Sequence, residues 1–581
     1  MTEPGRPLGT PDDIEALVRK YVARTARRYI PFIAALVVLV LIALLFPSRS
    51  QQNNNLTNTG NGSSSSLGGS TSGGSVGGGG SSGSTGGGST SGGGGGSVGG
   101  GSSSGIGGPI TAPAAVGTRG ITRSGIECGP GVRQVKWTVY APLCIPKYTG
   151  YNGGTRYRGV MKDKIVSFYR VDHSAQDTAV NAALGKANLD DTKYLADLQT
   201  YMTYFNSQFE LYGRKVQLFQ YTGTGDYLNE DQGLDNGQAA HDAQTAYQAD
   251  GFIDSTFPLK GSYPFWKAIA DDKMLTLDPV GFPQSWYVER QPYWYSALPT
   301  GTATANWVIN MVCQRMVNMK ASFAGDSIYK LKNRVFGLIH PDNPEYKDIG
   351  SYIKSELKSR CGVDLTGKEV SYTINVAEMG QEAASVAAQM KAAGVSTVLC
   401  YCDPIFPITL TNAADGQSYH PEWWTPGWGD AQAQNLPKDQ WTHAVVLGAP
   451  YPAKSQDEAY KVYKLANPHG EPQSPYYAVA YGVLLVMYDA LQTAGPDLNP
   501  RTFQKGWFGM GTITGPAGTL EWAPQHYSPI VSGPMSWFDF NQVSNFDQTA
   551  GAYRACDSGK YLPMDLSKAS QWGSGQVACF K

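Results

Sequence analysis

Short apolar runs alternate with segments of helical periodicity from about residue 160 onward. In Tyr194–Phe205 the apolar side chains recur at helical spacing, Gly213 stops the helix, and Val216–Tyr221 has the pattern of a strand. Strands this short and apolar are suited to burial on both faces, as in a parallel sheet covered by helices. The sequence therefore predicts an α/β fold built from repeated helix–strand units.

The unit recurs in two series, which predicts two doubly wound parallel-sheet lobes. The first series has strands at 165–169, 216–221, 252–253 and 274–277, with helices ending near 209 and over 238–248 and 264–270. The second has strands at 335–339, 370–374 and 397–402, with helices over 304–319, from an N-cap at Asn343 and Pro344 to Gly362, and through Met390. We expect lobe 1 at about 160–296 plus a later return, and lobe 2 at about 297–425 plus the C-terminal part, since one core rarely serves so long a chain.

The N-terminal region predicts a membrane anchor. Residues 30–46 carry no charged side chain and are long enough, at about 1.5 Å per residue, to cross a bilayer. The stretch 19–28 just before this run carries five basic residues and only Arg49 follows closely, which places the N-terminus in the cytoplasm. We therefore expect a cytoplasmic segment at 1–28 and one transmembrane helix at 29–47, with all that follows extracytoplasmic. A cleaved signal peptide is the competing interpretation.

A low-complexity segment separates this anchor from the α/β domain. Its composition is almost entirely Gly, Ser, Asn and Thr, with little apolar surface to bury. We expect residues 48–118 to be a disordered tether and residues 119–581 to be the extracytoplasmic domain. The apolar run at 476–493 is a second span candidate, but Asp489 and its polar surroundings favour a buried helix.

Charge and cysteine content limit the partners. The 46 basic and 47 acidic residues nearly cancel, which gives no reason to expect nucleic-acid binding. All eight cysteines follow the predicted span, where disulfides persist, and pairing of Cys128 with Cys144 and of Cys556 with Cys579 is favoured by proximity. Zinc is the alternative, but the spacing of Cys400 and Cys402 matches no zinc finger. No metal or cofactor is expected.

The order of these segments resembles a known family. The runs YFN, GRKVQLFQY, MLTLDP, QPYWYSALPT, RVFGLIHPDNPEY and STVLCYCDP, from about Tyr157 to the C-terminus, resemble the type I periplasmic solute-binding proteins, in particular the branched-chain amino acid (Leu/Ile/Val) receptors of ABC transporters. The resemblance implies two lobes joined by three crossovers that close on a small molecule. It also implies an ABC permease and ATPase as partners.

Ligands of open parallel sheets bind outside the carboxyl ends of the strands, where helix N-termini offer free N–H groups. This rule selects Asp172, His173, Ser255, Ser262, Asp278, His340, Asp342, Tyr346 and Asp403 as ligand-binding candidates. For an amino acid ligand, the resemblance implies that Ser262 meets the carboxylate and Asp403 the ammonium. Ser262 is equally an N-cap, Tyr346 a core residue and Asp403 a turn residue, and Asp278 would repel a ligand carboxylate.

Aromatic residues are numerous and offer surfaces that stack on flat or apolar ligands. The candidates are Trp286, Tyr287, Trp294, Phe406, Trp423, Trp424 and Trp428, for each of which core packing is the alternative.

Catalysis is not expected. The adjacent Asp172, His173 and Ser174 supply the residue types of a hydrolytic triad, but neighbours in sequence do not normally attain its geometry. We therefore expect a membrane-anchored extracytoplasmic receptor, not an enzyme, that binds a small organic solute such as an amino acid or amide for an ABC-type importer. The alternative is a ligand sensor or cell-surface interaction protein that uses the same two-lobe clamp.

Overall fold

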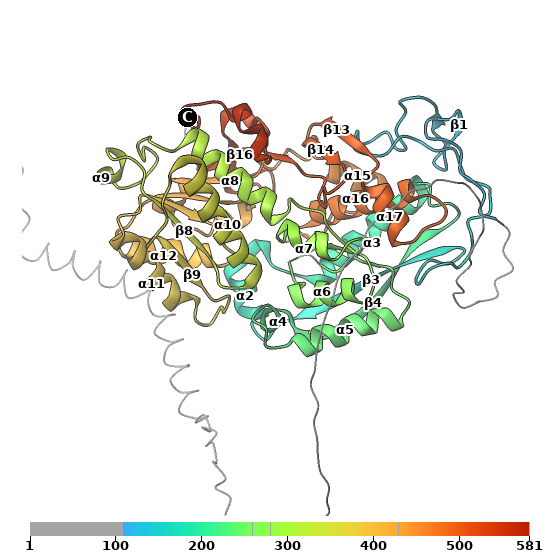
Figure 1. Ribbon diagram of the computed structural model, residues 1–581, viewed down its shortest axis with the longest axis horizontal. Helices are drawn as coiled ribbons and strands as arrows, with labels where there is room; N and C mark the ends of the chain where they lie inside the picture. The colour runs from blue at the N-terminus through green and yellow to red at the C-terminus, as the bar shows by residue number, and fades with distance from the viewer. Residues whose placement is uncertain (1–108, 258, 279–280, 428, 580–581) are drawn as a thin grey trace, which may run out of the picture. The chain divides into compact units, whose positions relative to one another are not determined.

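The described chain is built from strands covered by helices (Figure 1), and two parts of it each contain five parallel strands in the same order. The computed structural model describes residues 109–257, 259–278, 281–427 and 429–579. The predicted cytoplasmic segment, the predicted transmembrane helix and residues 48–108 of the predicted tether lie outside these ranges. Within the described residues, no helix combines the length and apolarity that a bilayer crossing requires.

Lobe 1 contains five parallel strands in the order β4-β3-β5-β6-β7. The sheet β4-β3-β5 joins the pair β6-β7 through the parallel bridge between Ile253 and Leu275. The strands are β3 (Lys164–His173), β4 (Lys215–Asp226), β5 (Ile253–Asp254), β6 (Thr276–Asp278) and β7 (Trp294–Ser296). The helices between them are α2 (Asp177–Leu184), the 3-10 turn η1 (Gly185–Ala187), α3 (Asp191–Gln208), α4 (Tyr227–Asp231), α5 (Asn236–Gln248), α6 (Tyr263–Asp271) and α7 (Gln284–Glu289).

Lobe 2 repeats this order in its parallel strands, as β9-β8-β10-β11-β12. The strands are β8 (Phe336–Pro341), β9 (Glu369–Tyr372), β10 (Thr397–Cys400), β11 (Glu422–Pro426) and β12 (Ala444–Leu447). The helices are α8 (Gly301–Arg315), α9 (Ser327–Lys330), α10 (Pro344–Cys361), α11 (Met379–Ala392), α12 (Phe406–Gly416), α13 (Asp430–Ala433) and α14 (Lys438–Trp441). Counted along each lobe, both orders read 2-1-3-4-5, which is a doubly wound arrangement.

The prediction that both sheets are purely parallel is wrong for lobe 2. The antiparallel strands β16 (Met535–Val543) and β17 (Ala550–Ala555) extend the sheet beyond β12. A hairpin adds strands without a crossover helix, so the helix–strand alternation used for the prediction does not detect it. The remaining C-terminal elements are β15 (Ser532–Gly533), η2 (Asp557–Gly559), β18 (Leu562–Pro563) and η3 (Leu566–Trp572).

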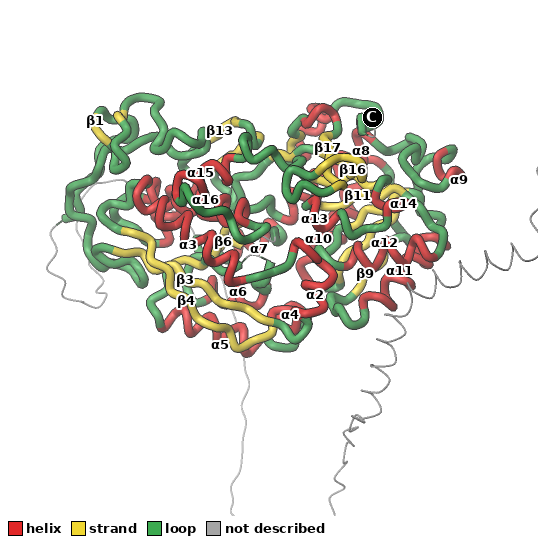
Figure 2. Tube along the Cα trace, turned by 180° about the vertical axis from the view of Figure 1, so that it is seen from behind, coloured by secondary structure: helices red, strands yellow, loops and turns green. Residues whose placement is uncertain are grey.

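The chain passes between the lobes at 297–300, 448–457 and 523–534. Between the second and third passages it returns to lobe 1, where α16 lies beside α3 and α17, as expected for a buried helix (Figure 2). The returning elements are α15 (Glu458–Ala466), α16 (Tyr477–Ala494), α17 (Pro500–Trp507), β13 (Gly511–Gly515) and β14 (Gly518–Trp522).

The start of the domain covers lobe 1. From residue 109, where the described chain begins, two strands precede β3, namely β1 (Gly120–Ile121) and β2 (Glu127–Cys128). Residues 109–118, which the sequence assigns to the tether, are hydrogen-bonded to the segment that precedes β3. The Gly117 amide donates to the Cys144 carbonyl, and the Tyr151 amide donates to the Thr111 hydroxyl. The local sequence pattern does not predict these bonds, because the partners lie some 30 to 40 residues further along the chain.

The eight cysteines form four disulfides. The predicted pairs Cys128–Cys144 and Cys556–Cys579 are confirmed. The other two pairs are Cys313–Cys361, which joins the ends of α8 and α10, and Cys400–Cys402, which follows β10. Disulfides therefore account for every cysteine, and no metal-binding cluster of His, Cys, Asp and Glu occurs in the described part of the chain.

Candidate functional site

The helices place a topological switch point in each lobe. In lobe 1, α3 follows β3 and packs with α16, whereas α6 follows β5 and packs with α5. In lobe 2, α10 follows β8 and packs with α8, whereas α12 follows β10 and packs with α11. The loops after the central neighbours β3/β5 and β8/β10 therefore diverge to opposite faces. In sheets of this kind ligands bind in that crevice.

Contacts between lobes 1 and 2 occur beside these loops. The Asn343 side-chain amide, just after β8, donates a 2.6 Å hydrogen bond to the carbonyl oxygen of Asp231 in α4. The Val376 amide, just after β9, donates a 2.9 Å bond to the Gln176 side chain, which follows β3. The carboxyl-end loops of the two sheets therefore meet each other.

A buried charge cluster lies at the end of β3. Arg170 forms ion pairs with Asp172, with Glu230 at 2.6 Å and with Asp242 at 3.1 Å, and all four side chains are essentially inaccessible. Burial lowers the pKa of Arg170, but these three carboxylates raise it above its ordinary value. Burial also raises the pKa of Asp172 well above its ordinary range, although Arg170 lowers it. The charge of Arg170 is therefore paired with carboxylates within lobe 1.

The remaining lobe 1 candidates, two serines and a histidine, differ in burial and in hydrogen-bond partners. Ser262 is the N-cap of α6, accepting from the Phe265 amide, and its hydroxyl donates to the Glu230 carboxylate. Ser255 is buried and shares a 2.6 Å hydrogen bond with Ser167. His173 is exposed at the end of β3. The carboxylate that bonds Ser262 would repel a ligand carboxylate at this point.

Asp278 is part of the core of lobe 1. It is fully buried, accepts a 2.7 Å bond from the Trp294 indole and accepts from the Tyr287 hydroxyl and the Gly281 amide. Its carboxylate is therefore bound to lobe 1 itself. Asp278 therefore gives no reason to expect repulsion of a ligand carboxylate, contrary to the expectation from the sequence.

Lys260 is a cation that the sequence analysis did not select. Its ammonium group lies 2.8 Å from Asp191 and 3.4 Å from Asp177, and Asp191 also accepts from the Tyr169 hydroxyl. Burial lowers the pKa of Lys260, and the two aspartates raise it, with a net rise. A single lysine between strand and helix carries no sequence signal, because its partners lie some 70 to 80 residues away in the chain.

The lobe 2 candidates cluster after β8 and β10. The Tyr372 hydroxyl donates to the buried Asp403 carboxylate, which also accepts from the Ile405 amide at 2.7 Å. Tyr372 in turn stacks on Phe406, with ring centroids 3.5 Å apart. Burial raises the pKa of Asp403, and the bond from Tyr372 lowers it. Asp403 therefore fixes its own turn, which is the alternative that the sequence left open.

The residues after β8 are less enclosed. Asp342 is half-buried and accepts a 3.3 Å bond from the Thr373 hydroxyl. Tyr346 is also half-buried and lies edge-on to Tyr401, with ring centroids 5.9 Å apart. His340 is buried, with its ring near the Pro341 carbonyl and Glu369. Asp342 and Tyr346 are thus the lobe 2 candidates with accessible surface.

Two carboxylates missed by the sequence analysis lie at the same meeting of the lobes. Glu345, in the first turn of α10, is 7% exposed, and burial raises its pKa to about 7. Burial and the nearby Glu345 raise the pKa of Asp231 well above its ordinary range, although the Tyr263 amide donates to it. The site therefore gathers acidic and aromatic groups from both lobes.

Most of the aromatic candidates belong to the core. The fully buried rings include Tyr287, Trp294, Phe406, Trp423 and Trp424. Trp286 is partly buried and lies 4.4 Å from the Tyr263 ring. Trp428 lies outside the described residues. Among the described candidates, Trp286 alone retains appreciable exposure.

Two cavities lie away from the nine predicted residues. One, of about 520 Å³, lies between α5 and α6 and is lined by Tyr263, Lys267 and Asp271 among others. The other, of about 260 Å³, is lined by Asp430, Tyr451 and residues of the β16–β17 hairpin. Neither cavity is lined by a residue that the sequence selected.

Comparison with known proteins adds structural likenesses only. No model of a protein family matches the sequence, and no curated protein matches it. The matching solved structures include ABC transporter substrate-binding proteins. They are of the class that the sequence resemblance names.

Three of these structures differ in the solute that their descriptions name. The chain is similar to a fatty acid ABC transporter substrate-binding protein from Thermomonospora curvata, at 14% identity, covering 72% of this chain and 97% of that chain, with a TM-score of 0.49. It is similar to a leucine-, isoleucine-, valine-, threonine- and alanine-binding protein from Brucella ovis, at 13% identity over 70% and 96%, with a TM-score of 0.49. It is also similar to a solute-binding protein from Rhodopseudomonas palustris BisB5 in complex with 3,4-dihydroxybenzoic acid, at 12% identity over 69% and 97%, with a TM-score of 0.47. At these values the likeness decides neither the ligand nor the function, and the argument rests on the strand order and the contacts above.

Proposed function

We propose that the chain is an extracytoplasmic receptor that binds a small organic solute between lobes 1 and 2 for an ABC-type importer. The observation that carries this proposal is the pair of 2-1-3-4-5 strand orders, in which a switch-point loop of each lobe bonds to a carboxyl-end loop of the other, through Asn343 with Asp231 and Gln176 with Val376. The bound solute lies between these loops. The chain itself performs no catalysis, and a separate permease and ATPase supply transport.

The charges favour an uncharged or amine-bearing solute over one held by its carboxylate. The buried cations Arg170 and Lys260 are each engaged by two or more carboxylates of lobe 1. Asp342, Glu345 and Asp231 lie at the meeting of the lobes. An ammonium or amide N–H group can donate to the oxygens of all three groups, because a carboxyl group accepts hydrogen bonds whether or not it is protonated. Burial raises the pKa of Glu345 and Asp231, so these two groups repel a ligand carboxylate less than ionised ones would. We therefore expect the solute, an amino acid, amide or related compound, to be held through its nitrogen donor.

The membrane anchor completes the proposal. The apolar run at 29–47, with its basic flank on the N-terminal side, retains the receptor at the cell membrane with its N-terminus in the cytoplasm and the binding domain outside. Tethering keeps the receptor within reach of its permease. Fractionation of cells, with protease added from outside, tests this topology: residues after the run become cleavable and residues before it stay protected.

A ligand screen tests the function. Purified full-length protein is heated with amines, amides, amino acids, sugars and aromatic acids, and its unfolding is followed. A solute at 100 times its dissociation constant adds about 2.7 kcal/mol of stability, which raises the unfolding temperature measurably. We expect amines, amides or amino acids to give the shift. Absence of any shift across the panel contradicts the proposal and favours the sensor or cell-surface interaction protein.

Matched variants locate the site. Asp342 accepts a threonine hydroxyl beside the meeting of the lobes, and Asp364 accepts the hydroxyl of Thr366 in an exposed turn. Asp342→Asn should weaken binding of the solute found in the screen at least tenfold, and Asp364→Asn should leave binding unchanged. Equal affinity in the two variants would place the solute elsewhere.

A further inference from the structure

The connection between β3 and α3 is long and carries structure of its own. Connections from strand to helix in α/β units usually span about two to six residues. Here residues 174–190 intervene, and they include α2 and η1. We call residues 174–190 the strap. Because it follows β3, the strap is itself one of the switch-point loops of lobe 1, and both views place α2 beside α4 of that lobe (Figures 1 and 2).

Lobe 1 holds the strap firmly. Near its start, the Ala175 amide donates a 2.7 Å bond to Asp226, and Asp177 accepts from the Tyr227 hydroxyl at 2.9 Å. Lys260 pairs with the same aspartate. Near its end, the Tyr476 hydroxyl donates a 2.6 Å bond to the Ala187 carbonyl. The strap is therefore anchored at both ends to the lobe from which it emerges.

The strap also bonds directly to lobe 2. The Val376 amide donates to Gln176 at 2.9 Å, and the Lys186 ammonium lies 2.5 Å from Asp547 in the β16–β17 hairpin. Gly185, in a left-handed conformation with φ of 57°, lies against Asn435, which follows α13. These contacts extend along the strap from its first helical turn to its last.

Apolar burial accompanies the polar bonds. Val180, Leu184 and Ala187 of the strap are buried, and they belong to one apolar cluster that also contains Ala431 and Leu436 of lobe 2. Removing these side chains from water favours contact of the lobes, and the direction of the hydrogen bonds fixes their alignment. Because lobe 1 already orders the strap, little conformational entropy is lost when lobe 2 meets it.

We propose that the strap holds lobes 1 and 2 together in the protein without solute. Separation of the lobes leaves the strap on lobe 1 and breaks its contacts with Val376, Asp547 and the α13 region. The arrangement with these contacts is thus populated before any solute arrives. This proposal concerns the unliganded protein and does not depend on whether a solute binds.

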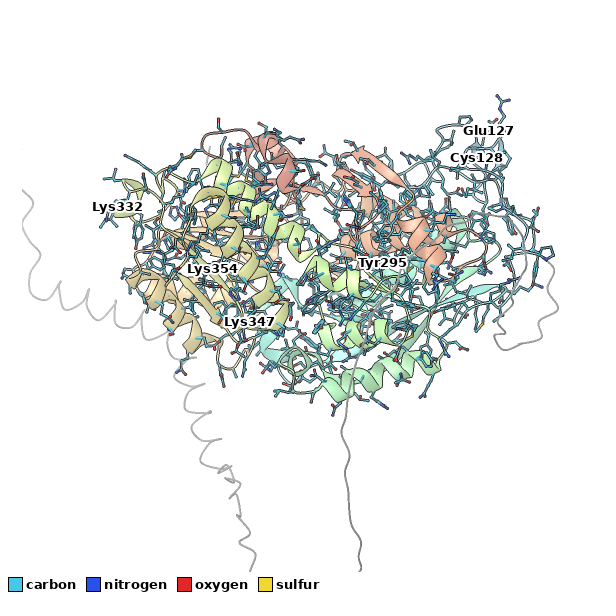
Figure 3. The ribbon with its side chains drawn as sticks, viewed as in Figure 1. Glu127, Cys128, Tyr295, Lys332, Lys347 and Lys354 are labelled. Atoms are coloured by element: carbon cyan, nitrogen blue, oxygen red, sulfur yellow. A yellow bond between two sulfur atoms is a disulfide. The ribbon has the colours of Figure 1, made fainter. Side chains whose placement is uncertain are left out.

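Distance measurements between the lobes test the proposal. Spin labels are placed on the full-length protein by unnatural amino acids at Gln238 in α5 and at Lys347, which lies exposed on α10 (Figure 3). Without solute, the distance distribution should be narrow. In the double variant Gln176→Ala/Lys186→Ala, a second population at longer distance should appear. An unchanged distribution overturns the proposal.

A matched variant controls for loss of a surface ion pair. Lys193 pairs with Asp190 at 3.3 Å within lobe 1, and its side chain is 46% exposed, close to the 54% of Lys186. Lys193→Ala should keep the narrow distribution. Broadening in this variant as large as in the double variant would also overturn the proposal, since it would show that the strap contacts with lobe 2 are not the cause.

Hydrogen exchange supplies a readout at the bond itself. Gln176→Ala should accelerate exchange of the Val376 amide at least tenfold, and Gln176→Glu, which keeps an acceptor oxygen, should preserve its protection. The Leu338 amide, bonded to the Lys368 carbonyl inside lobe 2, should exchange equally in all variants and so reports that lobe 2 remains folded. Retained protection of Val376 in Gln176→Ala contradicts the role assigned to the strap.

Discussion

The Asn343 side-chain amide donates a 2.6 Å hydrogen bond to the backbone carbonyl of Asp231, and this bond joins the start of α10 to the end of α4. Asn343 occupies the N-cap position of α10, followed by Pro344, as the sequence predicts. Its side-chain oxygen makes no capping bond, and its side-chain nitrogen donates across the two lobes instead. A residue read from the sequence as a local cap thus has a long-range role.

Replacement of Asn343 by Ser should weaken the contact between the lobes. Serine retains good N-cap character but is too short to reach Asp231. A lost hydrogen bond of this kind typically costs about 1 kcal/mol. We expect a lower unfolding temperature and faster amide exchange around α4.

The matched control for this prediction is Asn499→Ser. The Asn499 side chain accepts from the Arg501 and Thr502 amides and so caps its own helix, α17. Since serine also caps, stability should change by only a few tenths of a kcal/mol. If the two variants lose equal stability, the bond from Asn343 to Asp231 contributes nothing beyond capping.

The stability of the protein should depend on Glu345 as pH changes. Burial raises its pKa from 4.5 to about 7, so the folded state binds a proton that the unfolded state has released. The stabilisation of the protonated form is complete below pH 4.5 and is lost as pH rises through 7. Relative to Glu345→Gln, the wild-type protein should lose about 2–3 kcal/mol between pH 5 and pH 8.

Urea unfolding at the two pH values measures this difference. The exposed Glu378, at the start of α11, supplies the control Glu378→Gln, whose stability should follow the wild-type protein at both pH values. If the wild-type protein instead gained stability relative to Glu345→Gln as pH rises, the predicted direction of the pH dependence would be wrong.

Arg170→Met should destabilise lobe 1 severely. The change leaves Asp172, Glu230 and Asp242 buried near one another without their cation. Breaking a buried ion pair from one side typically costs about 3–5 kcal/mol. Lys267→Met removes a pair with Asp271 whose side chains are 42% and 49% exposed, and it should cost less than about 1 kcal/mol. Thermal unfolding of both variants checks the contrast, which fails if their losses are similar.

The disulfides should differ in their contribution to stability. Cys313–Cys361 closes a separation of 48 residues, and its loop entropy predicts a loss of roughly 4 kcal/mol in Cys313→Ser/Cys361→Ser. Cys400–Cys402 closes a separation of 2 residues, so Cys400→Ser/Cys402→Ser should lose far less stability by this mechanism. Denaturant unfolding of the two double variants measures the order, and a larger loss for the shorter loop would contradict it.

The candidate site could be predicted only in outline. Strand periodicity located the loops that carry Asp342 and Asp403, because a strand pattern ends where its loop begins. It ended the first strand too early, because Asp172 and His173 lie within β3 and not in the loop after it. It did not indicate what these side chains bind. Arg170 and Tyr372 lie on strands and gave no signal, yet they engage Asp172 and Asp403 and so determine which candidates remain accessible.

The sequence by itself determined the α/β character of both lobes, most helix and strand positions and two of the disulfides. These follow from local periodicity, turn residues and chain proximity, which act over a few residues. Only the tertiary structure decided the antiparallel hairpin of lobe 2, the pairing of Cys313 with Cys361, and the strap between the lobes. The physical reason is that ion pairs, hydrogen bonds and apolar contacts between residues far apart in the chain depend on distances that no local pattern encodes.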